Sequence, residues 1–395
     1  TSDKPHYPYE LPKGWVWTTL GDLFSLQAGK NIAAKEIYPE FSEIYKYPCF
    51  GGNGIRGFVS NFNRNGDFPI IGRQGALCGN VNLAIGDFYA TEHAVVVERF
   101  SDTDLMWTYY VLIALNLNQY ATATAQPGLA VNVINDVIVP VPPFQEQCRI
   151  SKAVTRLFSL INEIEHGKQK LQGTIKQTKS KVLDLAVHGK LVPQDVNDEP
   201  ANELLKRINP KAEIITDNGH YQKLPDGWCL TILGSIGTWQ SGATPSRLRK
   251  DYYGGNIPWL KTGDLNDGII TNIPEFITEK ALEETSVKLN PTDSILIAMY
   301  GATIGKIGIL SFPATTNQAC CACLDYKIDK MYIFYFLLSN RINFVSMGGG
   351  GAQPNISKEK IVNTTFPLPP LAEQKRIVSK IEELFNQLDM IEESL

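Results

Sequence analysis

The sequence has no long hydrophobic run. None of its apolar stretches approaches the ~20 residues that a membrane-spanning helix needs. It also does not begin with the charged and then apolar leader of a secretory signal. We therefore expect a chain that neither enters a membrane nor is secreted. With 43% hydrophobic and 20% charged residues, its 395 residues have room for two or three domains with cores of their own.

Paired cysteines are lacking as well. Three of the seven cysteines, Cys320, Cys321 and Cys323, lie close together, but no second pair stands at the spacing of a zinc site. Because this cluster lies in an apolar run, we expect buried and reduced thiols, which is typical of a cytoplasmic protein. We predict neither a metal nor a cofactor.

The chain has no excess of positive charge. Its 37 basic and 41 acidic residues give a net charge of −4, whereas a general, non-specific nucleic-acid binder normally carries a basic excess. A local basic face, or a partner that supplies cationic surface, is compatible with this balance.

No catalytic motif stands out. The segment Gly301–Lys306 resembles a phosphate-binding loop, but it is one residue short and Ile307 stands where Ser or Thr belongs. Its counterpart, Gly75–Asn80, lacks the lysine. We interpret both as paired turns of a repeated fold and predict a binding protein rather than an enzyme. The alternatives are a self-sufficient methyltransferase or nuclease, and a bivalent scaffold that binds protein or glycan ligands.

What the sequence does contain is a duplication. The pattern Leu-Pro-x-Gly-Trp at residues 11–15 returns at 224–228, and Pro-Pro-x-x-Glu-Gln-x-Arg-Ile at 142–150 returns at 369–377. A repeat this long is a duplicated domain and not a solenoid. Two similar modules suit two similar targets or one pseudo-symmetric target, of which duplex DNA with two half-sites is the leading example.

A heptad repeat follows each copy of the second pattern. Positions from Ile150 to Leu185 step by four and three residues and are apolar except at Lys168 and Thr178, and the same steps run from Ile377 to Leu395. No proline interrupts residues 145–187. The pattern predicts two long helices that pair as an antiparallel coiled coil. Shorter helices are expected over Leu105–Leu117 after a capping box at 101–104, over Met331–Leu338 and over Asn202–Ile208.

The antiparallel pairing predicts which apolar positions are covered. The second helix, as given, ends at the equivalent of Lys168. We expect it to cover Leu171, Ile175, Val182 and Leu185. We expect it not to reach Ile150, Val154 and Leu157. An exposed apolar seam is a docking surface, and the predicted subunit-docking residues are Ile150, Val154, Leu157 and Ile161.

Two groups of first-module residues are candidates for DNA contact. In the glycine-rich segment 50–57, Asn53 and Arg56 are side chains that pair bidentately with adenine and guanine edges. A plain hairpin turn through Asn53 and Gly54 is an equally good interpretation. A second group lies between glycines at 72–75, and His93 beside Glu92 is interpreted as a structural or recognition pair. The first-module candidates are Gly52, Asn53, Arg56, Arg73, Gln74 and His93.

In the second module, three cations follow one another closely in a loop rich in hydroxyls. Arg247, Arg249 and Lys250 there predict a phosphate clamp, and a solvated charged loop is the alternative. The glycine-rich segment 348–351, like its counterpart 125–128, either wraps a ligand or forms a turn. The second-module candidates are Thr244, Ser246, Arg247, Arg249, Lys250, Lys261, Tyr300, Asn317, Gln318 and Gln353.

These features together resemble the specificity subunit of type I restriction-modification systems. The resemblance covers nearly the whole chain and rests on the twin patterns above, on the order of the linking helices, and on three second-module segments. These segments are Gly242 to Arg247, Tyr252 to Lys261 and Thr316 to Ala319.

The resemblance implies a fold and a function. The expected fold class is α+β, with two similar mixed target recognition domains, two long antiparallel helices forming a coiled coil and a pseudo-two-fold relation. The expected division is 1–143 and 222–370 for the recognition domains, 144–221 for the central helix and linker, and 371–395 for the C-terminal helix. Each domain would read one half of a bipartite site in double-stranded DNA. The helices would dock methyltransferase subunits, which bind S-adenosylmethionine, and restriction subunits would join that non-catalytic core in bacterial defence.

Overall fold

A computed structural model describes residues 9–100, 102–122, 127–216, 224–349 and 354–395. The chain divides into two units, Thr1–His166 and Gly167–Leu395, and each is described by itself. Among the helices of the described residues, none combines the length and the apolar character needed to cross a bilayer.

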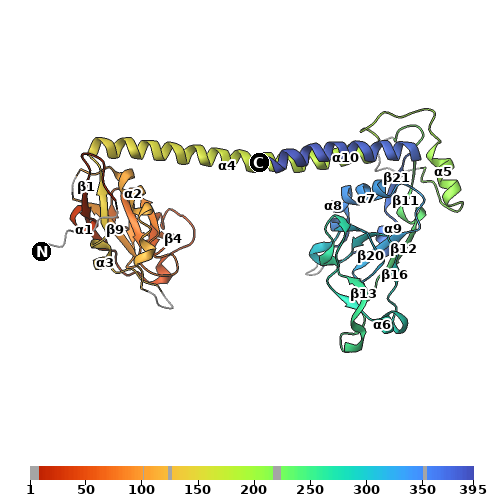
Figure 1. Cartoon of the computed structure of the whole chain (residues 1–395), viewed down its shortest axis with the longest axis horizontal. Coiled ribbons are helices and arrows are strands. Elements are labelled where there is room, and N and C mark those ends of the chain that lie inside the picture. Colours follow the sequence, from red (N-terminus) through yellow and green to blue (C-terminus); the bar gives the residue numbers. More distant parts are fainter. Residues whose placement is uncertain (1–8, 101, 123–126, 217–223, 350–353) are drawn as a thin grey trace. The chain divides into compact units, whose positions relative to one another are not determined.

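The first unit contains two four-stranded sheets and a two-stranded ladder (Figure 1). One sheet has the order β2(Phe24–Ala28)-β9(Ala94–Arg99)-β6(Phe68–Gly72)-β7(Val81–Ala84), and the other has the order β4(Gly54–Val59)-β3(Tyr47–Gly51)-β8(Asp87–Ala90)-β5(Arg64–Asn65). The ladder pairs β1(Val16–Thr19) with β10(Ile138–Val141). Strand β9 shows that the first sheet is buried on both faces. Val95 and Val97 belong to one buried cluster, and Ala94 and Val96 belong to another. Side chains alternate along a strand, so this run is apolar throughout because both faces are covered.

The second unit repeats this plan. One sheet has the order β12(Thr238–Ser241)-β20(Cys320–Leu324)-β17(Ile295–Ala298)-β18(Ile307–Leu310)-β14(Gly268–Ile270). The other has the order β15(Phe276–Ile277)-β13(Tyr253–Leu260)-β19(Ala314–Thr316)-β16(Leu289–Asn290). The two-stranded ladder pairs β11(Cys229–Ile232) with β21(Thr365–Leu368). Cys321 and Cys323 face one core, and Cys320 faces another. The expected buried, reduced thiols are confirmed, since all three are buried and free.

Short helices join the strands. They are α1(Leu20–Leu23), α2(Leu105–Ala114) and α3(Val131–Asn135) in the first unit, and α6(Glu279–Glu284), α7(Lys330–Ser339), α8(Arg341–Met347) and α9(Lys358–Val362) in the second. The start of α2 is capped by Asp104, whose carboxylate accepts from the Trp107 amide at 2.8 Å; Ser101 of the expected capping box lies outside the described residues. The helix ends three residues earlier than expected because Asn116 adopts a left-handed conformation (φ 47°).

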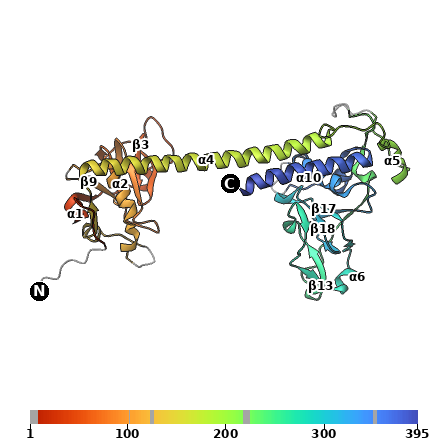
Figure 2. The same ribbon diagram turned by 45° about the horizontal axis from the view of Figure 1, so that its top comes forward.

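The predicted long helices are present. Helix α4 spans Phe144–Val187 and α10 spans Leu371–Glu393. They run antiparallel within the second unit: Lys168 donates to the carbonyl of Leu395 at 2.7 Å, and Lys179 pairs with Asp389 and Glu392. Figures 1 and 2 both show α10 lying along the C-terminal half of α4. The predicted antiparallel pairing is therefore confirmed.

Burial along α4 follows the expected seam with four exceptions. Ile175 and Val182 are buried, and Leu157 and Ile161 are exposed, all as expected. Leu171 is exposed and Leu185 is half-buried where burial was expected, so α10 covers less of the seam than the heptad register predicts. Ile150 and Val154 are half-buried rather than exposed. For Ile150 the reason is packing against the core of its own module, which the heptad pattern could not reveal.

Candidate nucleic-acid interface

A network of backbone hydrogen bonds joins the two sheets of the first module. The Lys30 amide, just after β2, donates to the carbonyl of Ala90 in β8 at 2.9 Å, and the Ala94 amide of β9 donates to the carbonyl of Thr91, just after β8, at 3.0 Å. Gly29 must be a glycine, because a Cβ there would lie 2.1 Å from the Ala90 carbonyl oxygen. This tight crossing fixes the loops that leave both sheets at one edge.

The second module has the same crossing. The Ala243 amide, which follows β12, donates to the carbonyl of Thr316 in β19 at 3.0 Å, and the Cys320 amide of β20 donates to the carbonyl of Asn317, just after β19, at 3.1 Å. A Cβ on Gly242 would lie 2.3 Å from the Thr316 carbonyl oxygen. The sequence duplication therefore extends to individual hydrogen bonds, and residues displayed beside the two crossings occupy equivalent positions.

The first-module candidates are brought together at this edge. A Cβ on Gly52 would lie 2.6 Å from the Gln74 carbonyl oxygen, and the Arg73 amide donates to the His93 carbonyl at 3.0 Å. Asn53 lies in the turn between β3 and β4, so the hairpin interpretation is correct, and the turn also places this residue among the other candidates. Three segments that are distant in sequence thus form one surface.

Single contacts orient three polar side chains of this surface. The Asn53 Oδ1 accepts from Asn80 at 2.7 Å, and His93 Nε2 lies 3.3 Å from a carboxylate oxygen of Glu92. The Arg56 side chain packs over Gly51, where an added Cβ would meet its Cδ at 2.3 Å. Arg56 is therefore held against the backbone beside the turn.

The two glycine loops are paired turns, as interpreted from the sequence. The Gly75 amide donates to Pro127 at 2.9 Å, and the Gly301 amide donates to Pro354 at 2.8 Å. Both glycines have positive φ, 92° and 65°. Tyr300 precedes the second turn and forms a bridge with Asn355. Gln353 lies outside the described residues, as do residues 123–126 of the counterpart loop.

The basic loop of the second module differs from a bare phosphate clamp. The guanidinium of Arg247 donates to Glu275 at 2.5 Å and lies over the rings of Tyr253 (4.4 Å) and Trp259 (5.0 Å). Lys261 pairs with the other oxygen of Glu275 at 2.8 Å. These donors, Arg247 first, hold the pKa of Glu275 below its usual value. The loop thus carries its own counter-ion.

Arg249 is engaged in the same way. It donates to both oxygens of Asp251 at 2.9 and 2.7 Å, and Lys280 reaches the same carboxylate at 2.9 Å. The hydrogen bond from Arg249 is the main reason that the pKa of Asp251 lies well below its usual value. Lys250 is exposed and has no carboxylate partner in the described part of the chain. Exposed ion pairs contribute little to stability, so these cations can change partners at low cost in free energy.

The remaining second-module candidates lie around the crossing. Thr244, Ser246 and Gln318 are exposed. The Oδ1 atom of Asn317 is buried and has no hydrogen-bond partner within the described residues, although its backbone is fixed by the crossing. The sequence did not reveal Glu275 as a partner of the basic loop, because it lies 28 residues from Arg247. Asp251, next to Lys250, could have been recognised from the sequence as an acidic partner of that loop.

A buried glutamine fixes the start of each long helix. Gln147 accepts from the Asp104 amide at 3.0 Å and donates to the Pro142 carbonyl at 2.9 Å. Gln374 makes the same two bonds, to Asp329 and Pro369, both at 2.9 Å. Sequence reasoning assigned no role to these residues, and the repeated Glu-Gln pair was the only signal for them.

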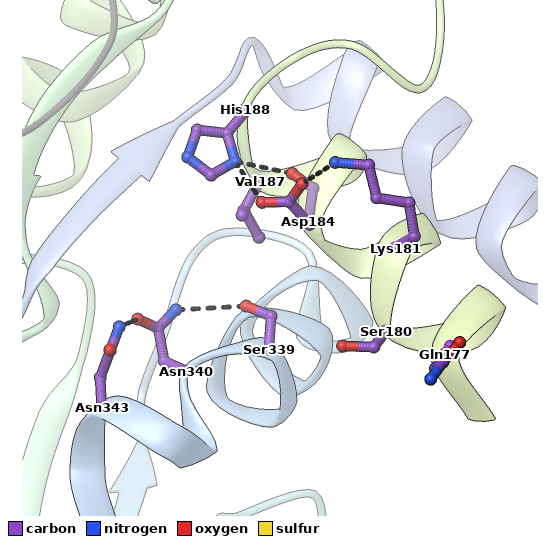
Figure 3. Close-up of a pocket in the computed structure, with 9 residues that line it drawn as sticks. All are labelled: Gln177, Ser180, Lys181, Asp184, Val187, His188, Ser339, Asn340 and Asn343. Carbon is purple, nitrogen blue, oxygen red and sulfur yellow. Dashed lines mark hydrogen bonds and ion pairs between the residues drawn. The ribbon is translucent and has the colours of Figure 1, made fainter. Parts of the chain in front are cut away.

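A polar hollow of about 650 Å³ lies between the end of α4 and helices α7 and α8 (Figure 3). Asp184 accepts from Lys181 at 2.6 Å and lies 3.2 Å from His188, and Asn343 donates to Asn340 at 3.1 Å. Its polar groups are largely occupied by one another. No group of acids, histidines and cysteines that could hold a metal occurs among the residues the structure describes.

Comparisons with known proteins agree with this architecture. The family model described as "Type I restriction modification DNA specificity domain" matches residues 12–172 and 225–395. The EcoprrI specificity subunit of Escherichia coli is 47% identical over 146 residues, which cover 37% of this chain and 36% of that protein. The EcoAI specificity subunit of Escherichia coli is 24% identical over 95% of this chain and 78% of that protein.

Two solved structures share the fold. A chain from a study of complex assembly and conformational transition of the type I R-M system is 17% identical, with a TM-score of 0.69 over 98% of this chain and 94% of that one. The HsdS subunit from Thermoanaerobacter tengcongensis is 17% identical, with a TM-score of 0.59 over 98% and 93% of the two chains.

The duplicated domain and its paired helices define a two-module protein of the DNA-specificity class. This chain belongs to the type I restriction-modification DNA specificity family, with one copy of the specificity domain in each module.

Proposed function

We propose that the chain is the non-catalytic DNA-recognition subunit of a type I restriction-modification complex and that each module reads one half of a bipartite duplex site. The observation that carries the proposal is the shared backbone crossing, which displays different side chains at equivalent positions. Gln74 and Tyr300 both precede the paired turns, and Glu92 and Gln318 both follow a strand of the crossing. A common scaffold with divergent side chains suits two half-sites of different sequence.

The two modules offer different contact chemistry. In the first module, Asn53, Arg56, Arg73 and Gln74 are side chains suited to base edges in the major groove. In the second, Arg247, Arg249, Lys250 and Lys261 are suited to phosphate oxygens, with the hydroxyls of Thr244 and Ser246 beside them.

The helices supply the assembly surface. Leu157, Ile161 and Ile164 of α4 are 59%, 47% and 70% exposed, and such a contiguous apolar face is a docking site in a complex. We assign it to methyltransferase subunits, which supply the catalytic groups and much of the cationic surface around the DNA. Restriction subunits then join this core, and the complex works in the cytoplasm, where it meets DNA.

Selection from a random duplex pool tests the proposal. The chain, alone and with a methyltransferase partner, should enrich duplexes with two short fixed blocks at a constant separation. A chain that enriched no duplex under either condition, but bound protein or glycan ligands, would support the bivalent-scaffold alternative. Methyl transfer to DNA by the purified chain alone would support the enzymatic one.

A further inference from the structure

Strands β13 and β3 hold equivalent places in the two modules. The Asn317 amide donates to the carbonyl of Leu260 in β13 at 2.9 Å, and the Thr91 amide donates to the carbonyl of Phe50 in β3 at 2.9 Å. Leu260 and Phe50 are therefore equivalent residues. Positions can be matched outward from this pair along both strands and onto their antiparallel partners, β15 and β4.

This match places Glu275 where the first module has Gly57. The Trp259 amide donates to the Glu275 carbonyl at 2.8 Å, and Cys49, the equivalent of Trp259, is paired with Gly57. A Cβ on Gly57 would lie 2.3 Å from the Tyr38 carbonyl oxygen, so no side chain fits there. The carboxylate of Glu275 is therefore a feature that the second module alone displays on this strand.

Two cations hold the Glu275 carboxylate. Arg247 donates to its Oε1 atom at 2.5 Å, and the Nζ atom of Lys261, which directly follows β13, lies 2.8 Å from its Oε2 atom. No other donor to this carboxylate occurs in the described part of the chain. An ionised carboxylate has about four acceptor positions, so both oxygens can accept further bonds. The side chain is 24% exposed, which leaves it open to a ligand.

The same cations make this carboxylate a selective acceptor. Hydrogen bonds from Arg247 and then Lys261 lower the pKa of Glu275, so at neutral pH the group is ionised and cannot donate. Their positive charge also offsets the repulsion between a carboxylate and DNA phosphates. A fixed acceptor with a compensated charge suits a ligand that offers an N–H donor.

We propose that Glu275 is a specificity-determining residue of the second module and accepts a hydrogen bond from the exocyclic amine of one base, cytosine N4 or adenine N6, in the major groove. Guanine and thymine present oxygen acceptors there instead, so an ionised carboxylate selects cytosine or adenine on the strand that it contacts. On the corresponding strand of the first module the charged side chain is Arg56, which is suited to guanine acceptors. The inference rests on the proposed function and names one contact through which it acts.

Selection from a random duplex pool, with the full chain and a methyltransferase partner, tests the role of Glu275. In Glu275→Gln the side-chain amide both donates and accepts. Preference at one base pair of one block should therefore relax roughly tenfold, and the other block should stay as it is. Loss of negative charge acts on all duplexes alike, so preference is measured as a ratio of affinities between duplexes.

Two further variants separate base contact from charge. Glu275→Asp keeps the charge but withdraws the carboxylate by one methylene group, so it should relax the same base pair and keep the salt dependence of the parent chain. The matched control is Glu284→Gln, which removes a carboxylate from Arg249 of the same basic loop. Glu284 belongs to α6, which lies beside β13 (Figures 1 and 2), and its variant should leave every base preference unchanged.

Base analogues identify the amine at the affected base pair. Purine in place of adenine, or 2-pyrimidinone in place of cytosine, removes the exocyclic amine alone. Binding of the parent chain to the substituted duplex should weaken roughly tenfold, and binding of Glu275→Gln should change little. The analogue that produces this difference shows which base supplies the donor.

Two results would overturn the inference and leave the proposed function standing. One is a Glu275→Gln variant that selects the same bases as the parent chain at every position of a bipartite site. The other is an equal loss of binding for parent and variant when the amine is removed. A parent chain that enriched no bipartite site would overturn the proposed function, and this inference with it. Thermal denaturation of each variant checks that it is folded.

Discussion

Arg247 donates to Glu275 at 2.5 Å while its guanidinium lies over the ring of Trp259. Glu275 therefore neutralises a cation that we propose as a DNA contact. We expect Glu275→Gln to tighten duplex binding at low salt and to make the dependence on salt concentration steeper, by about one unit of slope for each additional phosphate that the protein neutralises. Fluorescence anisotropy across a salt series measures both effects. Glu359→Gln, an exposed acid on α9, is the control, and equal slopes for the two variants would contradict the expectation.

This effect has a defined pH dependence. Hydrogen bonds from Arg247 and Lys261 lower the pKa of Glu275 in the folded chain. Its ion pairs therefore contribute fully to stability above the unfolded pKa, and this contribution is lost as the pH falls through the lowered folded pKa. At pH 5 the carboxylate should still be charged, and the tighter binding of Glu275→Gln should be undiminished. If the variant and the parent chain already bound equally at pH 5, the ion pair would not hold in solution.

Neutralising Arg247, Arg249 and Lys250 together should weaken binding to all duplexes. Each is expected to bind phosphate, so the salt slope should flatten by roughly one unit for each phosphate that is no longer neutralised, with little change in sequence preference. The measurement is the same salt series on specific and scrambled duplexes. An unchanged slope with relaxed preference at one base pair would instead indicate direct readout of a base.

Exchanging one module should change one half-site. Replacing residues 15–142 by the same span of a relative keeps the helix start at Gln147 and the whole second module. We expect the selected DNA to differ in one block only, because the first module displays its own loops on its own crossing. Sequencing of selected duplexes decides the outcome, and a change in both blocks would show that the modules do not read independently.

The exposed face of α4 should be needed for assembly. Leu157→Asp with Ile161→Asp removes apolar area from a face whose buried side chains would each contribute on the order of 1.5–3 kcal/mol. Co-purification with a methyltransferase partner should fall sharply while thermal unfolding of the chain is unchanged. Ser159→Asp with Asn162→Asp is the matched control on the same turns. Assembly that survived the first pair would move the docking site elsewhere.

The cysteines offer a test of the two cores. Burial raises the pKa of Cys321 to about 12 and that of Cys229 to about 11, and thiolates are the reactive form. At pH 8.5 in native buffer, iodoacetamide should therefore modify the half-buried Cys148 first, and the others only after denaturant is added. Peptide mass spectrometry reads the order, and early labelling of Cys321 would contradict the packing described.

The sequence by itself determined the duplication, both long helices and their antiparallel pairing, because heptad spacing and repeated motifs are local patterns that survive any loop change. It also determined that the glycine loops are turns. Only the tertiary structure decided what those elements meet. Glu275 reaches Arg247 from 28 residues away, Gly52 comes to lie against Gln74, and Ile150 packs into its own module instead of joining the exposed seam. Such contacts depend on how the sheets cross and on which faces they bury, and no spacing along the chain encodes that geometry.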